Sequence, residues 1–300
     1  MTIRVSLCAL SGLLVCGCGT STSLDTLRYV PEDATVVASV DVAALQRSAV
    51  FKDVLGPRLH RAAPWVSTGL ERCNVGLDRW KPLVVAAPAE RAATLAVVSA
   101  PGLGKRSTLD CLAGQMKAIG LTPWVMSDDT HLVFGNGQGR VVDDDTVALF
   151  TGSWSSAVTG VLDGTAPTAK DGPIAQLVAR AKVDQPLWVG VRLDDRDTNT
   201  EKALEVAATG MIGAVTLDSP LSLRATLELA DGSDPEVAAT RAEALYETSV
   251  RDTLANAGVA AAALDSVRFE REGSRLVGTA TVALADIDAM VSGWLGSASP

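Results

Sequence analysis

The sequence predicts an α+β fold made of two similar halves, each an antiparallel sheet packed against helices. Three observations support this prediction. Segments rich in β-branched residues arrive in adjacent pairs, helical segments separate the pairs, and the order of elements in residues 30–152 resembles that in residues 153–298. Strands that follow one another closely favour antiparallel pairing, whereas strictly alternating strands and helices favour a parallel sheet. We therefore do not expect a doubly wound α/β domain.

Composition places the chain among folded proteins. Its 300 residues are 47% hydrophobic and 20% charged, as in globular proteins. A net charge of −9 without any run of Lys and Arg argues against nucleic acid as a partner, because a phosphate-binding surface needs a basic patch. No apolar stretch reaches the roughly 18 residues that cross a bilayer as a helix.

The first half is expected to begin with a strand of β-branched residues at 35–42. Asp41 is placed to cap a helix over residues 43–55, which Gly56-Pro57 ends. The elements that follow are a helix within 59–73, paired strands at 81–88 and 93–100, a helix over 109–119 capped by Ser107 or Thr108, a hairpin over 122–135 turning at Asp128-Asp129, a strand at 145–152 and a helix at 153–162.

The second half is expected to repeat this character. Leu223, Ala225, Leu227 and Leu229 share one face of a strand, because they alternate with polar residues. The expected elements are a helix at 173–181, a strand at 186–193, a helix from the capping box at 198–201 through 210, the strand at 222–230, a helix from Asp234-Pro235 to about 256, a hairpin over 266–284 turning at Gly273, and a last helix capped by Asp286.

The first 17 residues are interpreted as an export signal. Arg4 supplies a positive start, and the apolar run from Val5 to Val15 is too short to span a membrane. The following Val15-Cys16-Gly17-Cys18 resembles the lipobox of bacterial lipoproteins, which ends in an obligatory cysteine. The resemblance implies cleavage before Cys18 and a diacylglyceryl group on that cysteine, which would hold the protein to a membrane. The alternative is an ordinary signal peptide.

Residues 18–29 are then expected to be a short polar tether between the lipid and the body. We expect the protein in the cell envelope, facing the periplasm. Gly19 stands where an Asp would indicate retention in the inner membrane, which favours the outer membrane over the inner one.

Two cysteines, Cys73 and Cys111, remain in the body. Disulfides persist in exported proteins, so the two can form a bond, although two separate buried thiols are the alternative. A metal site is not supported, because two cysteines and the distant His60 and His131 do not make a set of ligands.

The body resembles a group of exported bacterial lipoproteins of unknown function that have a duplicated α+β body. The residues that carry the resemblance are 30–55, 73–87, 107–116 and 172–193. The resemblance implies a disulfide between Cys73 and Cys111. It supplies no catalytic residue, because no activity is established for the group, and we expect no cofactor.

Several stretches resemble chemical motifs but lack essential residues. Gly104-Lys105 resembles the end of a phosphate-binding P-loop, yet Ser99 occupies the place of its first glycine. The stretch 195–206 starts like a calcium-binding EF-hand, but Thr200 and Val206 replace the required Gly and Glu. A Ser-His-Asp site would have to use His60 or His131, and no G-x-S-x-G sequence is present.

We therefore expect a non-catalytic binding or structural role, with an unknown envelope protein or an apolar ligand as partner. One alternative is a carrier of a lipid or other apolar ligand, which predicts a large apolar pocket lined by strand residues such as 223–229. The other is a hydrolase with an unrecognised acidic site, which predicts converging titratable groups. The tryptophans are expected in the core, because they are spread evenly along the chain, at positions 65, 80, 124, 154, 188 and 294.

Overall fold

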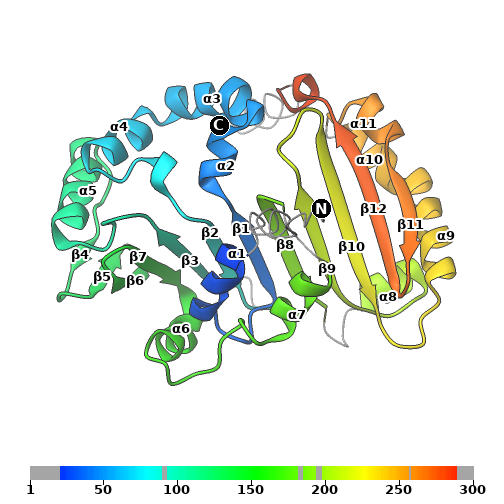
Figure 1. Ribbon diagram of the computed structural model, residues 1–300, viewed down its shortest axis with the longest axis horizontal. Helices are drawn as coiled ribbons and strands as arrows, with labels where there is room; N and C mark the ends of the chain where they lie inside the picture. The colour runs from blue at the N-terminus through cyan, green and yellow to red at the C-terminus, as the bar shows by residue number, and fades with distance from the viewer. Residues whose placement is uncertain (1–20, 90–92, 182–184, 194–197, 257, 289–300) are drawn as a thin grey trace, which may run out of the picture.

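The computed structural model confirms the α+β fold and joins its strands into one antiparallel sheet (Figure 1). It describes residues 21–89, 93–181, 185–193, 198–256 and 258–288. The strand order across the sheet is β11-β12-β10-β9-β8-β1-β2-β3-β7-β6-β5-β4. The strands of residues 30–152 form one side of the sheet, and those of residues 153–298 form the other.

The described strands are β1 (Val36–Val40), β2 (Leu83–Ala87), β3 (Thr94–Ser99), β4 (Val125–Met126), β5 (His131–Phe134), β6 (Gly137–Asp143), β7 (Thr146–Thr151), β8 (Leu187–Arg192), β9 (Ala208–Val215), β10 (Leu221–Leu229), β11 (Arg268–Glu272) and β12 (Arg275–Val282). The main helices are α1 (Ser21–Thr26), α2 (Val42–Arg47), α3 (Gly56–Ala62), α4 (Pro64–Arg72), α5 (Arg106–Ala118), α6 (Ser155–Leu162), α7 (Pro173–Arg180), α8 (Thr198–Leu204), α9 (Pro235–Leu245), α10 (Arg251–Asn256) and α11 (Ala261–Asp265).

The two sides of the sheet share an order of elements. Each begins with three consecutive antiparallel strands, β1-β2-β3 on one side and β8-β9-β10 on the other. A helix follows the third strand, and the last strand of each half, β7 or β12, returns to pair with that third strand. The two halves meet where β1 pairs with β8, so the sheet is continuous between them.

Two helices begin at an aspartate that caps them through its side chain. The Asp41 side chain accepts a hydrogen bond from the Ala44 amide at the start of α2, as predicted, and Asp234 accepts from the Glu236 amide at the start of α9. The helix expected over 43–55 is interrupted at Ser48, whose ψ of 156° is extended. It resumes as a π-helical segment, η2 (Val50–Leu55).

Other boundaries differ from the sequence prediction. Helix α5 begins at Arg106, and neither Ser107 nor Thr108 caps it, since Lys105 is its N-cap. The helix expected to reach residue 210 ends at Leu204, because the chain then enters β9, which is hydrogen-bonded to strands on both sides. Pairing within the sheet therefore outweighs the local helical tendency of these residues.

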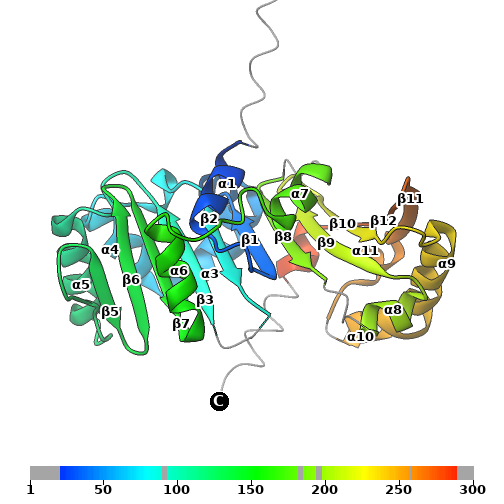
Figure 2. The same ribbon diagram turned by 90° about the horizontal axis from the view of Figure 1, so that it is seen from below.

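The largest core cluster lies on one face of the sheet. Helix α7 contributes Ile174 and Leu177, which pack with Trp188 and Ile212 of the strands beneath them. Figure 2 shows α1 and α7 together on this side of the sheet, with α8 and α10 on the opposite side.

Residues 21–29 differ from the short polar tether that the sequence predicts. They form α1 and a 3₁₀ turn, η1 (Leu27–Tyr29), and Leu27 is fully buried in the largest core cluster. The apolar side chain of Leu27 accounts for this difference, because its burial stabilises the packed arrangement by about 2 kcal/mol.

Candidate functional site

The face of the sheet that is turned away from α7 is unusually open at its centre. We call it the open face. On β2 and β8, residues that point toward α7, such as Val84 and Trp188, are buried. Their neighbours along each strand point the other way. Val85 is 39% exposed to solvent and Val189 is 36% exposed. An exposed sheet face normally carries polar residues, so apolar residues here need another explanation.

The register of the strands aligns these apolar residues into rows that cross the sheet. One row pairs Val85 with Ala38, Ala38 with Val189, and continues through Gly213, Ala225 and Gly278. A parallel row runs through Leu83, Val40, Leu187, Val215, Leu223 and Ala280. No residue of either row is polar.

A groove lies over the second-half side of these rows. We call it the sheet groove. It has a volume of about 590 Å³ and runs between the open face and the segment that contains Tyr246, Val250 and Leu254. The hydroxyl of Tyr246 donates to the Leu264 carbonyl at 2.6 Å, so this buried polar group is satisfied within the wall. The groove is therefore lined almost entirely by carbon atoms.

A second recess lies over the first-half side of the same face, beneath α4 and α5. We call it the tryptophan cavity. Its volume is about 280 Å³, and Trp80 and Trp124 form part of its wall. The other lining residues are Gly69, Leu70, Val98, Leu103, Leu109, Leu112, Gln115, Met116, Leu132, Val147 and Leu149. An apolar cavity of about 150 Å³ is already large enough to bind benzene.

The two indole groups offer the cavity no hydrogen bond. Trp80 Nε1 donates to the Val75 carbonyl at 2.9 Å, and Trp124 Nε1 donates to the Leu109 carbonyl at 3.3 Å. Apart from these indoles, Gln115 carries the only polar side chain among the described residues of the wall, and its Oε1 accepts from Arg72 at 3.5 Å. An occupant would therefore be selected by its apolar surface rather than by polar recognition.

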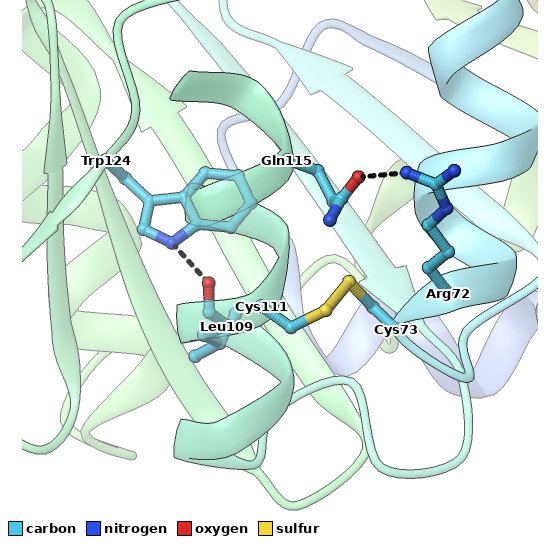
Figure 3. The surroundings of a disulfide bond; sticks show 6 residues. All are labelled: Arg72, Cys73, Leu109, Cys111, Gln115 and Trp124. Atoms are coloured by element: carbon cyan, nitrogen blue, oxygen red, sulfur yellow. Dashed lines mark hydrogen bonds between the residues drawn. A yellow bond between two sulfur atoms is a disulfide. The ribbon is translucent and has the colours of Figure 1, made fainter. Parts of the chain in front are cut away.

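The predicted bond between Cys73 and Cys111 is confirmed, and it ties together the two helices that roof the tryptophan cavity (Figure 3). Cys73 is the C-cap of α4, and Cys111 lies within α5. Their Cα atoms are 5.8 Å apart. The crosslink fixes the spacing of the roof helices, which limits how far they can collapse into the space below.

The other residues singled out in the sequence lie apart from both recesses. Cys18 lies outside the described residues, as does the start of the EF-hand-like stretch at 195–197. His60 is on α3, and His131 opens β5, where its Nδ1 lies 2.8 Å from Asp128 Oδ2. No carboxylate or histidine among the described residues lines either recess.

Asp128 stabilises the turn before β5 rather than a reacting centre. Its carboxylate accepts hydrogen bonds from the backbone amides of Thr130 and His131, both at 2.8 Å. These bonds lower the pKa of Asp128 from 3.8 to about 2. Within the described ranges, no group of three or more His, Cys, Asp or Glu side chains could hold a metal ion, and no helix is long and apolar enough to cross a membrane.

The sequence predicted only part of these recesses. Of the strand residues expected to line a carrier's pocket, Leu223 and Ala225 line the sheet groove, whereas Leu227 and Leu229 are buried in a core cluster with α9. Trp154 and Trp188 are buried as expected, but Trp80 and Trp124 are half-buried on a cavity wall. No sequence signal could have identified the tryptophan cavity, because its wall comes from helices and strands far apart along the chain.

This chain is similar in fold to solved structures of one other protein. No family model and no curated protein matches the sequence. Two crystal forms of TP0453, a Treponema lipoprotein associated with the outer membrane, have similar structures. Form III has a TM-score of 0.52 at 11% identity over 89% of this chain and 97% of TP0453. Form I has a TM-score of 0.50 at 11% identity over 89% and 96%. At this identity the comparison shows a shared fold alone.

Proposed function

We propose that this chain is a non-catalytic, lipid-anchored protein of the cell envelope that binds the apolar chain of a lipid in the tryptophan cavity. The observation that carries the proposal is a well-formed cavity whose wall offers almost no polar group. The likeness in fold to TP0453, an envelope lipoprotein, is consistent with this location. Attachment through Cys18 would keep the body close to a source of such ligands.

A lipid fits the recesses better than a protein partner or a hydrolase substrate. Protein interfaces have a polar rim and about one hydrogen bond per 100–200 Å² of buried area, whereas Gln115 is the one side chain with a free polar group that the described residues place on the cavity wall. A hydrolase needs titratable groups at the reacting bond, and neither recess presents a carboxylate or histidine from the described residues. An alkyl chain needs only apolar contact.

The proposal is tested with a chain that starts at residue 18 and carries Cys18→Ser, which keeps every described residue and lacks the lipid. The probe is bromodecanol with a terminal bromine, because bromine quenches tryptophan fluorescence on contact. We expect saturable quenching, since Trp80 and Trp124 line the cavity.

Two glycines on the roof helices provide a blocking variant and its matched control. A Cβ on Gly69 would meet Gln115 Cβ at 3.6 Å, an ordinary contact, so Gly69→Leu directs a side chain into the cavity without a backbone clash. Gly114 on α5 is exposed, with no atom within 4 Å of an added Cβ. Gly69→Leu should abolish saturable quenching and Gly114→Leu should preserve it. Equal quenching in both variants, or none in the parent, would refute the proposal.

A further inference from the structure

The tryptophan cavity and the sheet groove are connected by a strip of apolar residues on the open face. Leu149 in the cavity wall pairs with Ala96 of β3, and Ala96 pairs with Val85 of β2. Val85 in turn pairs with Ala38, which lines the groove. The strip crosses three strand spacings, which is about 14 Å at about 4.8 Å per spacing.

The middle of this strip is accessible and presents no polar side chain. Val85 is 39% exposed, and its neighbours Ala96 and Ala38 are half-buried alanines. Their small side chains leave the surface on both sides of Val85 low, so a ligand can lie across it. The two recesses therefore adjoin one continuous apolar surface of the sheet.

From this geometry we infer that both recesses serve one ligand, a lipid with two alkyl chains. One chain occupies the tryptophan cavity, the other occupies the sheet groove, and the linking head group lies over Val85 in contact with solvent. This inference rests on the proposed function and extends it to the class of lipid. Binding the first chain holds the second at a high effective concentration, which raises the overall affinity by about 10²-fold or more.

The first test compares ligands that share a glycerol head group. Monodecanoylglycerol and didecanoylglycerol are each titrated against the Cys18→Ser chain, and their dissociation constants are measured by displacement of bromodecanol. We expect didecanoylglycerol to bind at least about 100-fold more tightly, as expected for linked binding events. Monostearoylglycerol, which has one long chain, should bind less tightly than didecanoylglycerol.

A pair of matched variants tests the role of the connecting strip. Val85→Asp places a charge where the head group crosses between the recesses. Val133→Asp makes the same change at a valine of β5 that is 47% exposed and lies on the opposite face, since its row contains Gln138 and the buried Phe150. Val85→Asp should remove the advantage of the second chain and change monodecanoylglycerol binding by less than about threefold, while Val133→Asp should alter neither.

Three outcomes would overturn the inference: equal affinity for the one-chain and two-chain glycerides, equal or tighter binding of monostearoylglycerol, and an unchanged preference for two chains in Val85→Asp. In each of these cases monodecanoylglycerol still binds, so the proposed function stands. If monodecanoylglycerol does not bind at all, the proposed function fails and the inference fails with it.

Discussion

Removing the bond between Cys73 and Cys111 should destabilise the protein by an amount that follows from the length of the loop it closes. The two cysteines are 38 residues apart in sequence. Closing a loop of this length lowers the entropy of the unfolded chain and corresponds to roughly 4 kcal/mol at 25 °C. For a body of about 270 residues, that loss lowers the melting temperature by roughly 7 °C.

The measurement is urea unfolding of three samples: oxidised wild type, reduced wild type, and the Cys73→Ser/Cys111→Ser double variant. Reduced wild type is the matched control, because it lacks the crosslink but keeps both sulfur atoms. Since the crosslink acts by restricting the unfolded chain, the m-value should rise when the crosslink is lost and the unfolded chain expands. A loss below about 1 kcal/mol in both uncrosslinked samples would contradict this reasoning.

Two further predictions concern the turn before β5 and the packed N-terminal residues. Asp128 has a folded pKa of about 2 against 3.8, so its contribution to stability is present above pH 3.8 and is lost as the pH falls through 2. The difference in free energy of unfolding between wild type and Asp128→Asn should therefore stay constant from pH 7 to 5 and shrink between pH 3.8 and 2. The measurement is urea unfolding at each pH. A difference that stays constant down to pH 2 would contradict the role of this carboxylate. Leu27→Ala should cost about 2–5 kcal/mol because Leu27 is fully buried. Leu121→Ala, at a residue that is 43% exposed, should cost less than about 0.5 kcal/mol by the same assay, and equal effects would place residues 21–29 outside the cooperative fold.

Local signals in the sequence were sufficient for much of the secondary structure. The hairpin predicted at Gly273 is present. Its turn needs a positive φ, and Gly273 adopts a φ of 63°, which other residues rarely do. Strand β6 and strand β9 were missed. Each pairs with the strand before it and the strand after it along the chain, but both contain two glycines, which are rare in strands and weaken the local signal.

The sequence by itself determined the α+β class, the starts of α2 and α9, and which two cysteines of the body were available to form a disulfide. These follow from local alternation, from capping side chains, and from there being two cysteines after Cys18. Only the tertiary structure decided which face of the central strands would be covered. Strands β1, β2 and β8 carry apolar residues on both faces, a pattern equally suited to a sheet buried on both sides. Packing of α7 on one face leaves the other open, and the open face then becomes the wall of both recesses.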